Sequence, residues 1–486
     1  MSLTISLDKN NNVTLLTRLF SYILTFSILL LISSLFSLIK FRENPPIIPK
    51  KLLILIGENN TMAPSSTPTR ISITGRGMSR VRTPPLPSKN ITQEVFYNPC
   101  NERQALLRVY MYNLPPKFHF GMLGWSGGAN QTWPNLDNPR KIPRYPGGLN
   151  LQHSPEYWLT LDLLTSDTDT VVRPCTAVRV HNSRVADIVF VPFFSSLSYN
   201  RNPKLRASKQ RFNFDRKLQE ELVRYLRGRE EWGRKRGRDH LIVAHHPNSM
   251  LFVRKTLGSS MFLLSDFGRY SKKIANLEKD VIAPYKHMVT TISGANLPAF
   301  DQRPTLVYFQ GAIYRKDGGV IRQILHNLLK NEKDVHFKYG SVHTNGVSSA
   351  AKGMSTSKFC LSIAGDTPSS NRLFDAITSH CIPVIISDEI ELPFEDVLDY
   401  SNFCIFVRAK DAIKKGFLVN LLRGIPRDEW TKMSELLKNI TGRFEYQYPS
   451  RPNDAVDMIW QTIVRKKTHT MLNLHRKNRY NRSLKG

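Results

Sequence analysis

Apolar residues along most of the chain come in short runs that are separated by amphipathic stretches. The short runs predict buried strands, and apolar positions three or four residues apart predict helices. The expected strands cover residues 107–112, 186–192, 241–244, 262–265, 305–309, 335–339, 359–364 and 403–407, and the expected helices follow Pro155 and cover 218–226 and 320–329. Such alternation predicts an α/β fold built on parallel sheets.

The alternation is interrupted between Gly294 and Arg303, where proline-containing turns show no periodicity. A chain of 486 residues exceeds what one hydrophobic core normally spans, so two domains are expected. We expect two facing doubly wound domains over residues 105–300 and 301–465, followed by a basic tail over 466–486.

The N-terminal region predicts a membrane anchor. Residues 19–39 contain no charged side chain and are numerous enough to cross a bilayer as a helix. We expect a cytoplasmic tail over 1–18, a transmembrane signal anchor over 19–39, and a stem or linker over 40–104 that is rich in Pro, Ser, Thr and Arg. Basic residues after the span weakly favour the opposite orientation.

Five glycosylation sequons bear on that orientation, because they are modified only if the C-terminal bulk of the chain is lumenal. They begin at Asn59, Asn90, Asn130, Asn439 and Asn481.

The formal net charge of +30 admits nucleic acid, anionic lipid or an acidic polymer as partner. Basic residues gather over 201–238 and in the C-terminal tail. Neither stretch contains a zinc-finger spacing, a basic zipper or an aromatic RNA-binding signature. A lumenal domain would not meet a genome, so a nucleic-acid role is disfavoured. Solvated helices and a tail without fixed structure are the simpler explanation of the charge.

The segment from Phe359 to Asp388 carries the clearest chemical signal, because it reads as strand, loop, helix and strand. The Gly-, Pro- and Ser-rich loop leads into a helix N-terminus, which attracts phosphate. Arg372 lies in the first turn of that helix and is suited to a diphosphate. Asp375, one turn deeper, is suited to a ribose diol. An ordinary salt bridge between these two residues is the alternative.

Three other segments follow expected strands, where ligands of parallel sheets bind. The segment over 310–319, which contains Gly311 and Arg315, suits a second phosphate contact. In the first half, His246 and Asp266 each follow a strand and face the same cleft. Asp266 is the preferred candidate for a catalytic base and His246 the second, although each is also compatible with a turn residue that satisfies its own backbone.

Several motifs in the chain resemble those of the exostosin family of glycosyltransferases. They occupy residues 109–115, 187–194, 303–311, 371–377, 381–386 and 392–394, so the resemblance covers roughly 106–463. Within that family, residues 379–381 and 390–396 look most like the plant branch associated with arabinan side chains of pectin.

The resemblance implies a GT-B type fold with two facing Rossmann-like domains behind the anchor and stem. It also implies a single-pass type II Golgi protein with a lumenal catalytic domain, a nucleotide-sugar donor, and inversion at the anomeric carbon. Arg372 would contact the diphosphate and Asp375 the ribose, with Ser370 and Asn371 beside them in the donor site. Many family members carry Glu where this chain has Asp375.

Three functions are compatible with these features. The first is transfer of a sugar from a UDP-sugar to a cell-wall polysaccharide such as pectic arabinan. Arabinose is the preferred sugar, and xylosyl, galactosyl or glucuronosyl transfer is the alternative within this function. The second is a catalytically silent scaffold for an active partner, which includes association with related transferases. The third is a membrane-tethered binder of acidic polysaccharide.

Asp167-Thr168-Asp169 matches a metal-binding DxD pattern, but no apolar strand leads into it. We interpret it as a solvated turn and expect a metal-independent enzyme with no cofactor besides the UDP-sugar. Among the five cysteines, Cys100 and Cys175 are a possible bridge in an oxidising lumen, whereas Cys360 and Cys381 are expected to be buried thiols. The odd count leaves at least one cysteine unpaired.

Overall fold

The computed structural model describes residues 24, 26–27, 29, 100–168, 171–201, 209–292, 297–315, 319–340 and 346–482. The chain divides into two compact units, Met1–Thr92 and Gln93–Gly486. The expected anchor over 19–39, apart from four of its residues, and the stem up to residue 99 lie outside this description, as do the sequons at Asn59 and Asn90. Among the residues described, no helix is long and apolar enough to cross a membrane.

The first lobe of the second unit contains a six-stranded sheet in the order β2-β1-β3-β4-β5-β6, with every pairing parallel. Its strands are β1 (Leu107–Met111), β2 (Ala177–Val180), β3 (Ile188–Val191), β4 (His240–Val243), β5 (Met261–Leu264) and β6 (Val281–Ile282). Its helices are η2 (Pro116–Phe118), η3 (Phe120–Leu123), η4 (Pro139–Lys141), η5 (Gly148–His153), α2 (Pro155–Thr165), α3 (Ser195–Asn200), α4 (Lys209–Arg227) and α5 (Glu230–Lys235). Strands β2 to β6 are buried at every residue, which explains why β3, β5 and β6 are apolar throughout.

The second lobe contains a five-stranded parallel sheet in the order β11-β10-β9-β7-β8. Its strands are β7 (Thr305–Gly311), β8 (Val335–Tyr339), β9 (Ser357–Ile363), β10 (Ile382–Ile386) and β11 (Ile405–Phe406). Its helices are η8 (Phe300–Gln302), α6 (Val320–Leu329), α7 (Gly346–Ser355), α8 (Asn371–Thr378), η10 (Tyr400–Asn402), α9 (Ala409–Ala412), α10 (Phe417–Arg423), α11 (Arg427–Ile440) and η11 (Thr441–Phe444). The predicted α/β class with parallel sheets is confirmed.

The strand expected over 403–407 is shorter than its apolar run. Helix η10 extends to Asn402, and Phe403 closes that turn, so only Ile405 and Phe406 pair with β10. The buried side chains of Phe403 and Cys404 pack into the core from the turn instead of from a strand.

In each lobe the winding direction reverses at the first strand of the sheet. In the first lobe β1 lies between β2 and β3, and in the second β7 lies between β8 and β9, so the chain reverses its winding direction there. Ligands of doubly wound sheets bind beyond the carboxyl ends of the strands at such points. A ligand site is therefore expected at the loops after β7 and β9.

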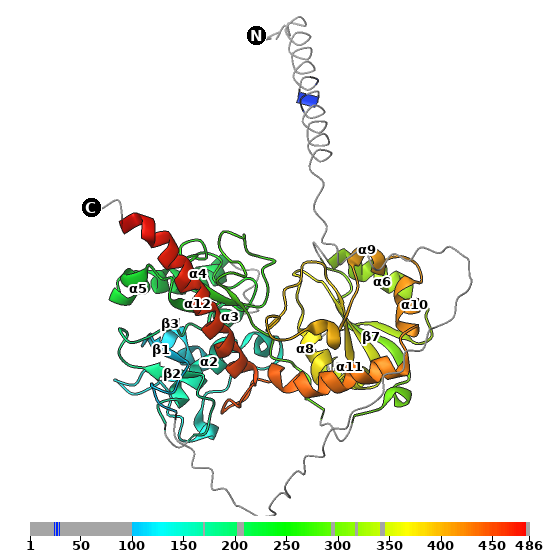
Figure 1. Ribbon diagram of the computed structural model, residues 1–486, viewed down its shortest axis with the longest axis horizontal. Helices are drawn as coiled ribbons and strands as arrows, with labels where there is room; N and C mark the ends of the chain where they lie inside the picture. The colour runs from blue at the N-terminus through cyan, green and yellow to red at the C-terminus, as the bar shows by residue number, and fades with distance from the viewer. Residues whose placement is uncertain are drawn as a thin grey trace, which may run out of the picture. The chain divides into compact units, whose positions relative to one another are not determined.

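The last helix, α12 (Ala455–Arg482), leaves the second lobe and packs against α2 and β6 of the first (Figure 1). Residues 466–482, expected to form part of a basic tail, continue this helix. The range 301–465 expected for the second domain thus includes the first part of a helix that packs on the first lobe. Of the three sequons that lie in the described part, Asn130 and Asn439 are exposed and Asn481 lies in the last turn of α12.

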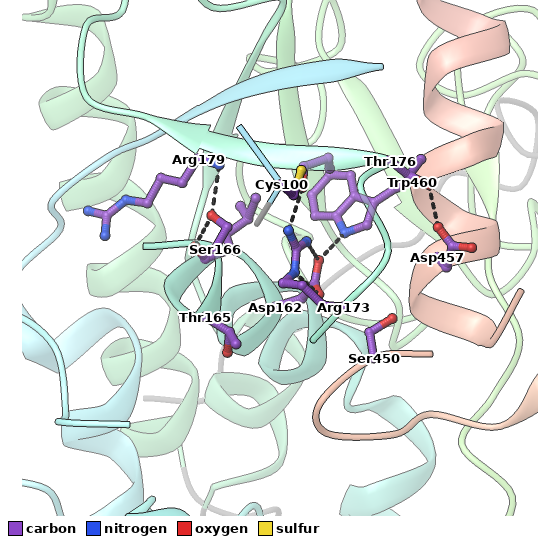
Figure 2. Close-up of polar contacts among 12 residues, drawn as sticks. Cys100, Asp162, Thr165, Ser166, Arg173, Thr176, Arg179, Ser450, Asp457 and Trp460 are labelled. Carbon is purple, nitrogen blue, oxygen red and sulfur yellow. Dashed lines mark hydrogen bonds and ion pairs between the residues drawn. The ribbon is translucent and has the colours of Figure 1, made fainter. Parts of the chain in front are cut away.

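A buried ionic cluster fastens α12 to the first lobe (Figure 2). The Asp162 carboxylate of α2 accepts two hydrogen bonds from Arg173, at 3.0 and 2.6 Å, and one from the Trp460 indole of α12 at 2.9 Å. Arg173 also donates to the Ala177 carbonyl oxygen at 2.9 Å. Both charged side chains are 4% exposed, so each depends on the other for compensation of its lost hydration.

The expected bridge between Cys100 and Cys175 is present, but the prediction of buried thiols at Cys360 and Cys381 is wrong, because these two also form a disulfide. Strands β9 and β10 are neighbours, and their register pairs Cys360 with Pro383, two residues beyond Cys381. The Cα atoms of the two cysteines are thereby brought to 5.7 Å. Cys404 is the buried free thiol, and burial raises its pKa well above the usual value.

The second disulfide closes a 21-residue separation that contains the loop after β9 and all of α8. We expect the double variant Cys360→Ser, Cys381→Ser to lose about 3 kcal/mol of stability, because a loop of this size gains entropy in the unfolded chain when it is opened. Thermal unfolding monitored by circular dichroism measures the change. Unchanged unfolding, or alkylation of three cysteines in the non-reduced wild type, would contradict the assignment.

Candidate functional site

A cavity of 490 Å³ lies between the two lobes of the second unit and receives side chains from both. The first lobe supplies residues from η5, from α3, from the loop after β4 and from the segment after β6; these include His153, Tyr199, His246, Asn248, Tyr285 and Met288. The second lobe supplies the end of β7 and the loop after it, α6, the loop after β9 and the first half of α8, with Gly311, Arg315, Arg322, Ser370, Asn371, Arg372 and Asp375. The candidate donor residues from the sequence therefore meet in one place.

The start of α8 is built as an anion site. Ser370 is the N-cap, and its hydroxyl oxygen accepts the backbone N–H of Arg372 at 3.4 Å and the Nη1 group of the same residue at 3.2 Å. The Leu373 N–H donates to the Ser370 carbonyl oxygen at 3.2 Å, and the residues of this helix start line the cavity, where the helix dipole favours negative charge. A phosphate group suits this arrangement.

The Arg372 guanidinium is held in a fixed orientation. Its Nε group donates to the Gln310 carbonyl oxygen at 2.7 Å, and its charge lies 5.3 Å from the ring centre of Phe309. Gly311 makes room for it, because a Cβ at that position would lie 2.2 Å from Nη2. The described contacts of Arg372 include no ion pair with Asp375, so the alternative of a simple salt bridge is not what the structure contains.

Two further arginines make this wall of the cavity strongly positive. Arg322 is 2% exposed and donates to the carbonyl oxygens of residues 312, 363 and 364 at 3.2, 2.7 and 3.0 Å. Arg315 is nearer to solvent and pairs with Asp366 at 2.8 Å.

The charges of these arginines repel one another along this wall of the cavity. Burial and the charges of Arg372 and Arg315 lower the pKa of Arg322 to about 9, and burial lowers the pKa of Arg372 to about 10, helped by Arg315 and opposed by Asp375. Both guanidinium groups remain charged at neutral pH. An anion with two or more negative charges would relieve this repulsion and replace lost hydration.

Asp375 is held by partners within the protein, and the ribose contact expected of it stays a prediction. One carboxylate oxygen accepts the backbone N–H groups of Met288 and Val289, at 2.7 and 3.3 Å, and the other accepts the Asn371 amide at 2.7 Å. Burial raises the pKa of this carboxyl against those hydrogen bonds. Asp375 thus joins α8 to the segment that connects the lobes.

Asn371 carries the unsatisfied group of this site. Its NH₂ group faces the Asp375 carboxylate, which fixes the orientation of the amide. Its Oδ1 atom is buried and has no hydrogen-bond partner within the described structure. The residue as a whole is 6% exposed and lines the cavity. A buried acceptor of this kind is rare unless a ligand or water supplies the donor.

The two candidate bases from the first lobe are also placed. Asp266 is 3% exposed; it accepts the Ser369 hydroxyl at 2.5 Å and the backbone N–H of Gly268 at 2.9 Å, and it is not among the described residues that line the cavity. His246 lines the cavity, and its Nδ1 atom accepts the backbone N–H of Asn248 at 3.0 Å. Asp167 of the DxD pattern pairs with Arg179 at 2.7 Å, and Asp169 lies outside the described residues.

Sequence reasoning missed Arg322 and His153. Arg322 lies on α6 and looks like an ordinary helix residue, because only the fold brings it below the loop after β9. His153 ends η5, immediately before α2, and follows no strand. The signal that was available is weak: an arginine on the apolar side of an expected helix and a histidine directly before one.

Comparison with known proteins also identifies a glycosyltransferase family. The family model described as the Exostosin GT47 domain matches residues 103–423. A relative from Arabidopsis thaliana, named probable arabinosyltransferase ARAD1, is 41% identical over 363 residues, covering 75% of this chain and 79% of the relative.

More distant relatives include a probable glucuronosyltransferase from Oryza sativa subsp. japonica, 25% identical and covering 75% of this chain and 82% of the relative. The probable β-1,4-xylosyltransferase IRX10L from Arabidopsis thaliana is 24% identical with the same coverage. Among solved structures, the crystal structure of TarM matches with 11% identity and a TM-score of 0.26 over 51% of this chain and 57% of that chain, which is too low to support a conclusion.

Proposed function

Since the chain belongs to the exostosin GT47 family and is a glycosyltransferase, we propose that it transfers arabinose from a UDP-sugar to a cell-wall polysaccharide such as pectic arabinan. The observation that carries the proposal is the convergence of Arg372, Arg322 and the N-terminus of α8 on one cavity. The choice of arabinose rests on the name of the relative that is 41% identical.

The donor diphosphate would lie against the positive wall. Gln310 holds the Nε group of Arg372 and Ser370 holds its Nη1 group, so contact of this guanidinium with phosphate oxygens costs little further ordering. Negative charge develops on the leaving diphosphate in the transition state, and fixed cations strengthen their attraction as it develops. We propose that these arginines replace a metal ion in this role.

The reaction we propose inverts the anomeric carbon in a single displacement. The acceptor hydroxyl attacks from the face opposite the diphosphate, so the acceptor enters from the first lobe. His246, Tyr199 and Asn248 line that side of the cavity. The two lobes thus divide donor and acceptor between them, as in a GT-B type transferase.

The proposed location is a Golgi membrane, with the catalytic unit in the lumen behind a single type II anchor. Two disulfides, Cys100–Cys175 and Cys360–Cys381, support an oxidising compartment. The exposure of Asn130 and Asn439 is compatible with glycosylation there. Loss of mass on glycosidase treatment that is smaller in an Asn130→Gln, Asn439→Gln variant than in the wild type tests this orientation.

Glucuronosyl or xylosyl transfer is the second candidate, because relatives named for those activities match about the same part of this chain. Their identities of 25% and 24% give them less weight than the arabinosyltransferase. A radiolabelled UDP-sugar panel with arabinan and xylan oligosaccharides as acceptors tests the proposed function, and transfer of glucuronic acid or xylose alone would replace arabinose.

Asn371 gives a prediction about donor binding. We propose that a shift of the Asn371 amide on donor binding brings its Oδ1 atom, which is sealed inside the protein without a ligand, to a hydroxyl of the nucleotide sugar, so Asn371→Ala should weaken donor binding about tenfold, equivalent to about 1.4 kcal/mol. Titration calorimetry with UDP and with the UDP-sugar separates two sources. Weaker binding of both ligands places the hydroxyl on the ribose, and weaker binding of the UDP-sugar alone places it on the transferred sugar. Equal affinity of variant and wild type for both ligands would refute the contact.

A further inference from the structure

Three histidines meet on the acceptor side of the cavity. His153 comes from the end of η5, and His245 and His246 come from the loop after β4. The ring centre of His153 lies 5.2 Å from that of His245, 4.5 Å from that of His246 and 5.1 Å from that of Tyr285. His153 and His246 line the cavity, whereas His245 is completely buried behind them.

The hydrogen bonds of His245 determine which of its nitrogens carries a proton. Its Nε2 atom lies 3.2 Å from the Ala283 carbonyl oxygen, which only accepts, so Nε2 carries the hydrogen. Burial lowers the pKa of His245 to about 4, and the ring is therefore neutral at pH 7. A neutral imidazole with hydrogen on Nε2 has a lone pair on Nδ1.

That lone pair fixes the state of His153. The two Nδ1 atoms are 2.9 Å apart, so His153 donates its Nδ1 hydrogen to His245. Burial, with His246 and His245 nearby, lowers the pKa of His153 well below its usual value, so this ring is also neutral. The remaining nitrogen of His153, Nε2, consequently carries a lone pair and no hydrogen.

The Nε2 atom of His153 is open to the cavity. The described part of the chain provides no hydrogen-bond partner for this atom. The residue is only 4% exposed, but Nε2 is not one of the fully buried polar atoms without a partner, so it is accessible. Since His153 lines the cavity, the accessible surface of this atom faces the space that the acceptor would occupy.

We propose that His153 is the catalytic base that takes the proton from the attacking acceptor hydroxyl, with His245 as the positioning residue that holds its tautomer. This inference rests on the proposed function. The acceptor oxygen bonds to the anomeric carbon as its proton passes to Nε2 of His153. The bond from that carbon to the phosphate oxygen breaks, and its electron pair leaves with the nucleoside diphosphate.

The same hydrogen-bond reasoning sets His153 apart from the two candidates that the sequence suggested. His246 uses Nδ1 to accept the Asn248 N–H, so in its neutral form Nε2 carries a hydrogen and donates. Both carboxylate oxygens of Asp266 already accept hydrogen bonds, one of them from Ser369 of the second lobe. Ser369 also contacts the Tyr285 hydroxyl at 3.0 Å. Asp266 therefore stabilises residues of the cavity wall and is not itself among the described residues that line the cavity.

The test is to compare full-length His153→Ala and His246→Ala in a transfer assay, with UDP binding measured by calorimetry. We expect His153→Ala to bind UDP within about threefold of wild type and to lose between a hundredfold and ten-thousandfold in kcat, the range of general base catalysis. Added imidazole should restore part of the His153→Ala rate, because it fits the space left by the ring. His246→Ala should show no such rescue.

A second pair of variants covers the positioning role and the case of a misfolded alanine variant. His245→Phe removes the acceptor of the Nδ1 hydrogen, so kcat should fall while KM for the donor stays the same. His153→Gln should remain inactive while binding UDP. Unchanged kcat in His153→Gln, or imidazole rescue of His246→Ala in place of His153→Ala, would overturn the assignment. Absence of transfer by the wild type from any UDP-sugar would instead refute the proposed function.

Discussion

Replacing Arg372 by alanine should reduce the transfer rate about a hundredfold to a thousandfold, since removing one preorganised charge contact commonly costs about 3 to 4 kcal/mol of transition-state stabilisation. The effect is large because the guanidinium is already oriented by Gln310 and Ser370 before any ligand arrives. UDP affinity should fall as well, because the diphosphate is charged in the ground state. Steady-state kinetics and calorimetry with UDP measure the two losses.

Two comparisons separate this role from a structural one. Arg372→Lys keeps the positive charge but loses the planar pair of donors, so its activity should lie between those of alanine and wild type. Arg315→Ala should have the smaller effect, since that side chain is 40% exposed and already paired with Asp366. If Arg372→Ala retains full UDP affinity while its unfolding is unchanged, the diphosphate does not lie at the start of α8.

Replacing Asp162 by alanine should destabilise the protein by about 3 to 5 kcal/mol, because Arg173 would remain buried without its counter-ion. The Trp460 indole N–H would lose its acceptor at the same time, which loosens α12 from the first lobe (Figure 2). Urea unfolding followed by tryptophan fluorescence measures the loss. The double variant Asp162→Leu, Arg173→Met should recover much of it, because it removes both buried charges.

The matched control is another ion pair of α12. Arg465 pairs with Asp396 at 2.5 Å, but these side chains are 36% and 42% exposed. Asp396→Ala should therefore cost about 1 kcal/mol or less. Equal losses for the Asp162 and Asp396 variants would show that burial does not determine the strength of these contacts.

The alternation of strands and helices was predictable because strands buried on both faces leave continuous apolar runs in the sequence. Helix α6 covers Val320–Leu329, as the pattern predicted, and the fully buried strand β5, Met261–Leu264, lies within one residue of the predicted range 262–265. The position of Arg372 at a helix start was also predictable, since it depends on a local arrangement of strand, loop and helix, whereas its donor-binding role stays a prediction.

Contacts between distant residues were beyond the sequence. The partner of Asp375 is the backbone of Met288, 87 positions away, and the partner of His153 is His245, 92 positions away. The bridge between Cys360 and Cys381 required knowing that β9 and β10 are neighbours. Pairings of this kind follow from sheet order, which local periodicity does not encode.

The predictions for the N-terminal anchor, the Golgi location and the donor sugar stay predictions. The most direct test of the central claim is a transfer assay in which the purified full-length protein meets a panel of UDP-sugars and an arabinan oligosaccharide. We predict transfer from a UDP-pentose without added metal, with inversion at the anomeric carbon by NMR, and its loss in Arg372→Ala. Failure to use any UDP-sugar, or equal transfer by wild type and Arg372→Ala, would contradict the account.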